Sequence, residues 1–319
     1  MHLTEDEALL VETVTKLVSD EVKPFARAWE ATGIPGELWT TLGELGLLAI
    51  TTPESKGGAG LGLRDLGLVV GHLAQGDLGL AWALARHNQA LAILAETPFQ
   101  NLDPYLSGQL QLDWSQTSTV SSSQGCDSLL VIADEKVVLR NCSRVESPQR
   151  LIGARSLGHA KLDPENSVEA LGSYGDIEVL ESQGALLAAC MAWGIGRSAL
   201  DAATTYALDR EQFGRPIAQF QAIQWKLADG ALLLEASELL VDHGLSHPTT
   251  SRSAMAFKAS LDALTKLVDD GLQTHGGYGY TEDFDIEKYY RDAQFLAGRM
   301  GTRRGQSLKL AQTILNQVS

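Results

Sequence analysis

The sequence predicts a mostly α-helical protein with a small β region in its middle. Long alanine- and leucine-rich stretches with apolar residues at helical spacing fill both ends of the chain. Between them lie short β-branched runs, serines and turn residues, which are typical of strands and loops. We therefore expect an N-terminal helical domain at 1–97, a truncated β domain at 98–178 and a C-terminal four-helix bundle at 179–319.

The N-terminal part begins with a helix start signal. Thr4 and Glu7 have the spacing of a capping box, and apolar residues then follow at helical spacing up to Pro24. A short helix is expected at 37–45. The glycines and proline of 51–62 predict a loop. The apolar stretches at 63–75 and 78–96 predict two interior helices.

The middle part carries the strand signals. Ser128 to Ala133 and Lys136 to Arg140 are β-branched runs, and Asp134-Glu135 between them predicts a hairpin turn. Residues 151–162 are expected to supply further strands. The segments 97–115 and 163–178 are the predicted linkers. After them the helical pattern returns, and long helices are expected at 181–209, 217–245, 251–274 and 305–318.

Composition and charge exclude several classes of protein. The formal charge of the 319-residue chain is −15 at pH 7, with acidic and basic residues interleaved, which disfavours a nucleic-acid partner. Its three cysteines lie far apart and follow no metal-ligand spacing, which fits a reducing cytoplasm and no metal site. No signal-peptide pattern and no long uncharged apolar run is seen, so neither export nor a membrane partner is expected.

Four motifs in the C-terminal half could carry chemistry. Tyr206 to Ile217 contains Arg210-Glu-Gln-Phe213-Gly, Gln219 to Gln224 follows, then Gln273 to Tyr280 with its glycines, then Glu287 to Ala293. The guanidinium of an arginine at a helix end is a planar fork suited to a pyrophosphate. Paired glycines let a backbone approach a ligand without a Cβ in the way. Alone, each motif is more often a solvated arginine or a helix stop.

These motifs, in this order and spacing, resemble those of the acyl-CoA dehydrogenase family. The N-terminal half agrees, with Leu45-Gly-Leu-Leu and the Gly57 to Leu61 loop in the matching places. In the family the matching arginine, phenylalanine and glycines contact the ADP half of the neighbouring subunit's FAD. The resemblance therefore implies FAD, shared with a partner, and cofactor-binding roles for Arg210, Gln212, Phe213, Gly214, Gln221, Gln273, Gly276, Gly277, Gly279 and Thr302.

The same resemblance leaves the chain without a catalytic base. Acyl-CoA dehydrogenation needs a carboxylate that removes the α-proton. The usual glutamate position is occupied by Met300, and the alternative position on the preceding helix falls at Gly184. Glu181, one turn earlier, could be a displaced base, although a surface glutamate near a helix start is the ordinary explanation. We therefore predict no catalytic residue in this chain.

Other departures concern the flavin site and the charged motif. Some tens of residues that hold the flavin ring in the family are absent from the middle part, and Arg304 replaces a usual glutamine. Glu287, Lys288, Arg291 and Asp292 are interpreted as a structural charge network. His275 is assigned no direct chemical role.

These losses resemble the degenerate, non-catalytic subunits of heterotetrameric actinobacterial acyl-CoA dehydrogenases. The resemblance implies an α2β2 complex with a catalytic paralogue that binds the acyl-CoA substrate, which could be a steroid side-chain CoA ester. It also implies electron-transfer flavoprotein as a further partner. Two alternatives stay open: a stand-alone flavoenzyme or lyase with an unrecognised base, and a non-enzymatic acyl-CoA binding or assembly protein.

Overall fold

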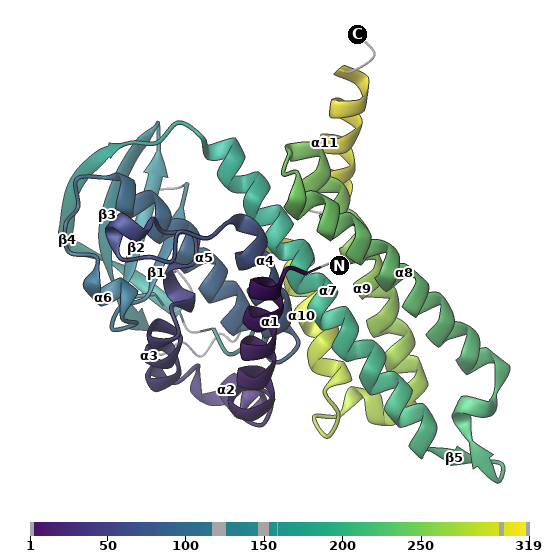
Figure 1. The fold of residues 1–319 in the computed structure, drawn as a ribbon. Helices are drawn as coiled ribbons and strands as arrows, with labels where there is room; N and C mark the ends of the chain where they lie inside the picture. Colours follow the sequence, from purple (N-terminus) through teal and green to yellow (C-terminus); the bar gives the residue numbers. More distant parts are fainter. Residues whose placement is uncertain (1–2, 117–125, 146–152, 158, 300–302, 317–319) are drawn as a thin grey trace.

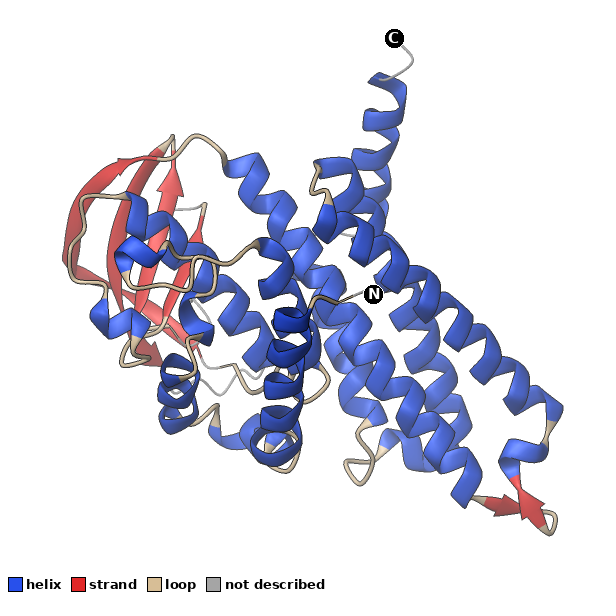
Figure 2. Cartoon of the chain, viewed as in Figure 1, coloured by secondary structure: helices blue, strands red, loops and turns tan. Residues whose placement is uncertain are grey.

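The structure is a computed structural model that describes residues 3–116, 126–145, 153–157, 159–299 and 303–316. Helices of the N-terminal part, a small sheet and a bundle of long helices follow one another along the chain (Figures 1 and 2). The predicted fold class is confirmed. Met300 and Thr302 lie outside the described residues, and so does the side chain of Arg304.

The N-terminal part consists of helices joined by short turns. Their bounds are α1 Glu5–Leu17 continued by the π-helical turn η1 Val18–Val22, α2 Ala26–Thr32, α3 Gly36–Glu44, the 3₁₀ turns η2 Leu47–Ala49 and η3 Glu54–Lys56, α4 Leu63–Ala74 and α5 Leu78–Glu96. The capping box is confirmed, because the Glu7 amide donates to Thr4 Oγ1 at 3.2 Å and the Thr4 amide donates to the Glu7 carboxylate at 2.9 Å. The sequence reading missed α2. It also assigned η3 wholly to a loop.

The middle part forms a four-stranded sheet in the order β1-β2-β3-β4. A short helix, α6 Asp103–Leu106, precedes β1 Leu112–Ser115, β2 Ser128–Ala133, β3 Lys136–Val145 and β4 His159–Ser173. Asp134 and Glu135 both have positive φ, 50° and 60°, which confirms the predicted tight hairpin turn between β2 and β3. The predicted linker at 163–178 is wrong, because most of it belongs to β4. Because β4 is one of the two edge strands, it accommodates Pro164 without breaking the sheet.

Helix α5 covers one face of this sheet. Leu91 and Leu94 of α5 share a buried cluster with Trp114, Leu130 and Leu139 of three different strands. Burial of this kind stabilises a sheet by about 1.5–3 kcal/mol for each large apolar side chain. The sheet is therefore anchored to the N-terminal helices through α5.

The C-terminal part is a bundle of long helices. Its elements are α7 Ile177–Asp209, the small strands β5 Glu211–Gln212 and β6 Arg215–Pro216, the 3₁₀ turn η4 Ile217–Gln219, α8 Gln221–Ser246, α9 Thr250–His275, the 3₁₀ turn η5 Gly276–Tyr280, α10 Ile286–Arg299 and α11 Arg303–Asn316. All four predicted helices are present. The sequence reading missed α10, which packs against α7 and α9. Helix α11 contacts α9 and extends past the end of the bundle (Figure 1).

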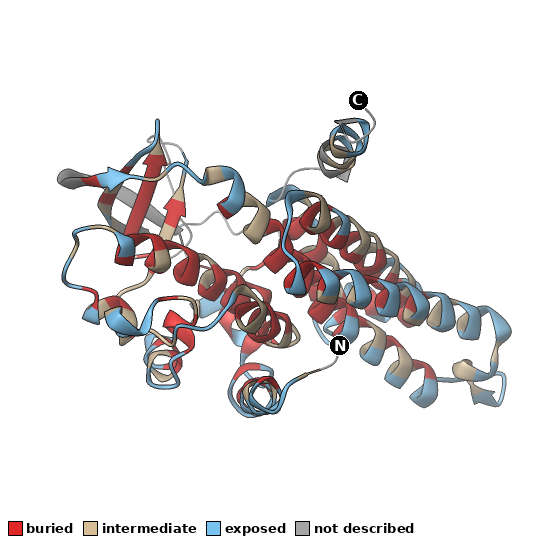
Figure 3. Cartoon of the chain, turned by 45° about the horizontal axis from the view of Figure 1, so that its top comes forward, coloured by how far each residue is buried: buried red, intermediate tan, exposed pale blue. Residues whose placement is uncertain are grey.

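Helix α7 is the buried spine of the bundle. It packs against α8, α9, α10 and also α4 and α5 of the N-terminal part. Figure 3 shows the buried residues along the inside of these helices and the exposed ones along the outer side of α8. By length and composition α7 could cross a membrane, but 67% of its most apolar window is buried inside the protein. Packing in the bundle accounts for its apolar character.

Candidate functional site

The first candidate site begins at the end of α7, where the chain makes a small hairpin. Arg210 follows the last residue of α7, and β5 and β6 pair with Phe213-Gly214 as their turn. Phe213 and Gly214 both have positive φ, 55° and 76°, as a two-residue turn of this twist requires. The hairpin lies at the tip of the bundle, at the opposite end from the β sheet (Figure 1).

Phe213 is an unusual residue for this turn. A non-glycine residue with left-handed backbone is strained by about 1–2 kcal/mol, and asparagine or glycine is the ordinary choice. The Phe213 side chain is 92% exposed, so no burial offsets this cost. Its ring meets Phe220 edge-on at 6.2 Å, and Phe220 carries the Arg215 guanidinium 4.3 Å above it. Backbone strain that burial does not offset is typical of functional positions.

The glycine motif forms the turn that ends α9. Gly276 has a φ of 61°, which favours glycine, and neither Gly276 nor Gly277 has a protein atom within 4 Å of a hypothetical Cβ. The backbone here is open to an incoming ligand. Gly279 differs, because a Cβ there would lie 3.0 Å from the Cβ of His275 and from the carbonyl oxygen of Leu272. Internal packing explains Gly279.

The hairpin and the glycine turn meet around a hollow of about 490 Å³. Of the predicted cofactor residues, Arg210, Gln212, Gly276 and Gly277 line it. The guanidinium of Arg210 lies 5.8 Å from the ring centre of Tyr278, which also lines the hollow. A cationic fork, an aromatic face and bare backbone suit a phosphate pair carried by an aromatic nucleotide.

The remaining predicted cofactor residues lie outside the lining of this hollow. Phe213 and Gly214 form the exposed hairpin turn beside it. Gln221 is the first residue of α8, and Gln273 lies in the last turn of α9; both are exposed. The sequence reading missed Tyr206 and Tyr278 as lining residues, although each lies within the motifs that it singled out.

His275 forms the floor of the hollow. It is 3% exposed and stacks on Tyr206 with ring centres 4.2 Å apart. Its Nδ1 lies 2.8 Å from the carbonyl oxygen of Gly271, so Nδ1 carries the hydrogen and donates it. Burial lowers the pKa of His275, with this hydrogen bond opposing the shift, and the imidazole is therefore neutral at pH 7. This arrangement supports the position of the glycine turn.

A second candidate site is a cavity of about 800 Å³ between α5, β1, α7, α9, α10 and α11. Gly184 and Glu181 line it from α7. Arg299, the residue before Met300, lines it from the end of α10. The fold thus brings Gly184 and the immediate neighbour of Met300 to one cavity. Among its described lining residues, the only carboxylates are Glu178 and Glu181, and the Glu181 carboxylate accepts a hydrogen bond from Gln116 Nε2 at 2.6 Å.

Four further lining residues of this cavity were not predicted from the sequence. Trp82 and Trp114 give it buried aromatic walls, and Arg86 and Arg299 give it positive charge. The Arg86 guanidinium lies 4.0 Å from the ring centre of Trp114, and its Nε donates to Asp113 at 2.7 Å. Arg86 and Asp113 are 27 residues apart and belong to different predicted domains, so no local pattern linked them.

The two candidate sites are far apart within one chain. Gly184 and Arg210 are separated by 26 positions of α7 and its end, which corresponds to about 39 Å at 1.5 Å per residue. That length exceeds the reach of a single dinucleotide. The hairpin therefore cannot complete a site in the cavity of its own chain.

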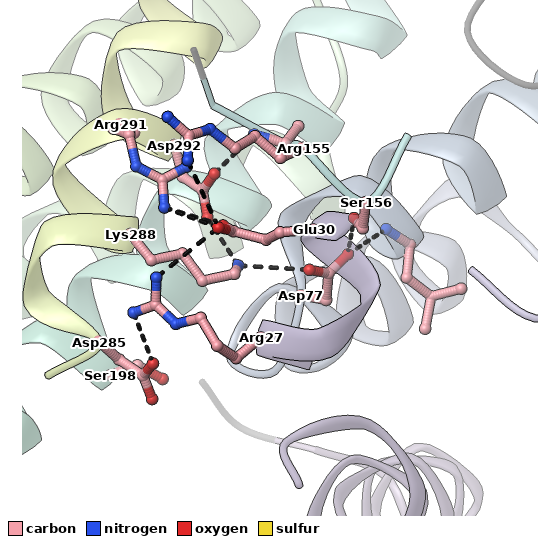
Figure 4. Close-up of polar contacts among 12 residues, drawn as sticks. Arg27, Glu30, Asp77, Arg155, Ser156, Ser198, Asp285, Lys288, Arg291 and Asp292 are labelled. Atoms are coloured by element: carbon pink, nitrogen blue, oxygen red, sulfur yellow. Dashed lines mark hydrogen bonds and ion pairs between the residues drawn. The ribbon is translucent and has the colours of Figure 1, made fainter. Parts of the chain in front are cut away.

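The charged motif of α10 forms a buried network instead of a catalytic group. Lys288 is 3% exposed, and its Nζ lies 2.9 Å from Asp292 and 3.3 Å from Asp77 (Figure 4). Burial alone would lower the pKa of Lys288, but the two carboxylates outweigh it and raise the pKa. Asp77 also caps α5 by accepting from the Leu80 amide, and Ser156 donates to it. Asp292 accepts from the Ala154 amide at 2.7 Å.

A second set of ion pairs surrounds this centre. Arg291 bonds to Glu287 and to both carboxylate oxygens of Glu30, and Arg27 also pairs with Glu287. Arg155 lies 3.8 Å from Glu30 (Figure 4). These contacts tie α2, the segment at 153–157 and α10 together. The prediction of a structural network for Glu287, Lys288, Arg291 and Asp292 agrees with these contacts.

Comparisons of the sequence and of the fold with known proteins point to the same protein family. Residues 4–97 match the model of the acyl-CoA dehydrogenase N-terminal domain, and residues 181–315 match that of the C-terminal domain. Probable acyl-CoA dehydrogenase YngJ of Bacillus subtilis is 28% identical over 381 aligned positions, covering 98% of this chain and 99% of the relative. Since this chain has 319 residues, several tens of those positions have no counterpart in it.

Two further matches are a relative of similar length and a solved structure. Acyl-CoA dehydrogenase IpdE2 of Mycolicibacterium smegmatis is 28% identical over 316 positions, covering 97% of this chain and 98% of the relative, so it is similarly short. Among solved structures, butyryl-CoA dehydrogenase of Megasphaera elsdenii superposes with a TM-score of 0.85 at 21% identity, covering 99% of both chains. The fold, both family models and the full-length relatives agree: the chain belongs to the acyl-CoA dehydrogenase family.

Proposed function

We propose that this chain is the non-catalytic subunit of a heteromeric, FAD-dependent acyl-CoA dehydrogenase. It pairs with a catalytic paralogue in an α2β2 complex that forms an α,β double bond in an acyl-CoA thioester. The paralogue holds the substrate and most of the FAD. This chain lends its hairpin and its glycine turn to the ADP half of that FAD.

The observation that carries the proposal is the exposed hairpin, about 39 Å along α7 from the chain's own cavity. Phe213 is held in a strained conformation with its ring in solvent, and Arg210 is exposed beside it. Neither residue can serve a cofactor in the cavity of the same chain. Both suit a nucleotide that another subunit presents at the tip of the bundle.

The residues present fit one half of a nucleotide site. Arg210 would bind phosphate oxygens with its planar guanidinium, and Tyr278 would support that guanidinium from below. Gly276 and Gly277 leave their backbone free for close approach. When bound, FAD supplies the hydride acceptor for the dehydrogenation. The role of this chain is to bind and orient, with no proton-transfer step assigned to it.

The second supporting observation is that neither position at which the family carries its base holds a carboxylate in this chain. Proton abstraction requires a carboxylate within hydrogen-bond reach of the substrate. Gly184 has no side chain, and Glu181 is held by Gln116 at the start of α7. With Met300 at the other expected position, the chain has lost both sites at which its family carries the base.

Relatives support the choice of cofactor and substrate class. A glutaryl-CoA dehydrogenase from Mycobacterium smegmatis has the same fold, with a TM-score of 0.86, and its structure was solved in complex with FADH2. We extend the proposal to a steroid side-chain CoA ester as substrate and to electron-transfer flavoprotein as the electron acceptor. The three free cysteines and the acidic composition support action in the reducing cytoplasm.

Flavin stoichiometry tests the proposal. The chain is purified alone and together with a co-expressed full-length paralogue, and FAD is measured from the visible spectrum. We expect no FAD on the single chain and one FAD for each pair of subunits. Arg210→Ala is expected to weaken FAD retention by the complex about tenfold. The control is Arg252→Ala, a half-buried arginine at the opposite end of the bundle, which should retain FAD normally.

The two alternatives predict different results. A stand-alone flavoenzyme or lyase would be yellow and active as the single chain, which would overturn the proposal. A non-enzymatic acyl-CoA binding or assembly protein would give partner complexes that contain no flavin. One FAD on each subunit of the complex would also contradict the shared site.

A further inference from the structure

The cavity of about 800 Å³ combines aromatic side chains with two guanidinium groups. Its size is within the range of small-molecule sites, which is about 300–1,000 Å³. Trp82 and Trp114 wall it with aromatic surface and are only 8% and 6% exposed. The buried aromatic surface of these two side chains favours a ligand with an aliphatic chain or ring.

The polar end of the cavity carries two guanidinium groups. Arg86 is already satisfied, because Asp113 accepts from its Nε and the carbonyl oxygen of Trp114 accepts from its Nη2. Arg299 has no ion pair with any residue in the part of the chain that the structure describes. Its guanidinium lies 5.3 Å from the centre of the Phe295 ring.

None of the described carboxylates near Arg299 forms an ion pair with its guanidinium. The Arg299 residue is exposed as a whole, but partial burial of its guanidinium lowers its pKa, Asp113 raises that pKa, and the like charge of Arg86 lowers it again. Asp113 is engaged with Arg86. Glu178 and Glu181 line the same cavity but form no ion pair with Arg299, and Glu181 is held by Gln116. A carboxylate from outside would complete the site, and guanidinium binds carboxylates bidentately.

We propose that this cavity is a second, non-catalytic ligand site that binds an amphipathic monocarboxylate. The apolar chain or ring of the ligand lies against Trp82 and Trp114, and its carboxylate binds Arg299. No covalent step is involved. The site is distinct from the hairpin, and its occupation requires neither FAD nor the partner subunit.

Calorimetric titration of the full chain tests this site with decanoate and with decan-1-ol as probes. They share an apolar chain and differ in the charge of the head group. We expect decanoate to bind to one site per chain, at least tenfold more tightly than the alcohol. Arg299→Gln should weaken decanoate binding about tenfold and leave alcohol binding unchanged. Binding of decanoate should also weaken as salt is raised.

The control variant is Arg197→Gln, an exposed arginine of α7 that pairs with Asp201 and does not line the cavity. It should bind decanoate as the unmodified chain does. Since Arg299 is exposed, its replacement should not unfold the protein, and circular dichroism checks this. Equal binding of acid and alcohol, no binding of either, or unchanged decanoate affinity in Arg299→Gln would each overturn the proposal.

Discussion

Replacing Lys288 by methionine tests whether the buried network holds the N-terminal and C-terminal parts together. Methionine keeps most of the apolar length of the side chain and removes its charge. It leaves the carboxylates of Asp77 and Asp292, each 1% exposed, without their cation. Ser156, Leu80 and Ala154 still donate to them, but a neighbouring negative charge is no longer balanced.

The expected loss follows from the burial of these groups. Removing one partner of a buried ion pair costs about 3–5 kcal/mol, because an uncompensated charge stays behind. Two carboxylates share Lys288, which places the effect at the upper end of that range.

Urea unfolding followed by circular dichroism measures the effect as a shift of the midpoint. The matched control is Lys258→Met, which breaks a pair with the same i,i+4 spacing between Lys258 and Asp262 on α9. That pair is 35% and 42% exposed, so its loss should cost about 0.5 kcal/mol. Equal midpoints for the two variants would refute the role assigned to Lys288.

Two further substitutions test the hairpin strain and a buried histidine. Phe213→Asn should relieve about 1 kcal/mol of backbone strain and raise the melting temperature of the single chain by about 2 °C in a thermal scan, while weakening FAD retention by the complex; a lower melting temperature would contradict the strain. Burial lowers the pKa of His87 to about 4, and its ring is neutral between the Tyr105 carbonyl and the Leu112 amide. Because the unfolded state takes up the proton first, His87 should cost the fold about 2 kcal/mol as the pH falls from about 7 to about 5. His87→Gln should flatten that part of the stability profile, and an unchanged slope in urea unfolding would show that other groups cause it.

Strong local signals made most of the fold predictable. The capping box at Thr4 and the positive-φ turn at Asp134-Glu135 fix their elements within a few residues of sequence. Helix α10 was missed because its buried face includes Lys288 and Asp292, which hide the apolar residues at helical spacing. The part of β4 after residue 162 was missed because Pro164 and its neighbours are ordinary turn residues, tolerated only at a sheet edge.

The candidate sites were predictable only where their residues are close in sequence. Arg210 and Gln212 are neighbours, and Gly276 and Gly277 are neighbours, so each pair was identified from its own motif. The cavity depends on contacts between α5, β1 and α10, which bring Arg86 and Arg299 together across more than half of the chain. No periodicity or spacing carries that information, because tertiary packing alone creates it.

The length of α7 has a thermodynamic consequence. Sites more than about 10 Å apart with no shared partners usually respond independently to substitution, and the two ends of α7 are separated by several times that distance. A double variant of Arg210→Ala and Arg299→Gln should therefore retain FAD as weakly as Arg210→Ala does and bind decanoate as weakly as Arg299→Gln does. The tip of the bundle could be redesigned for a different catalytic subunit without altering what the cavity binds. The choice of partner and the choice of ligand can therefore be changed separately in one fold.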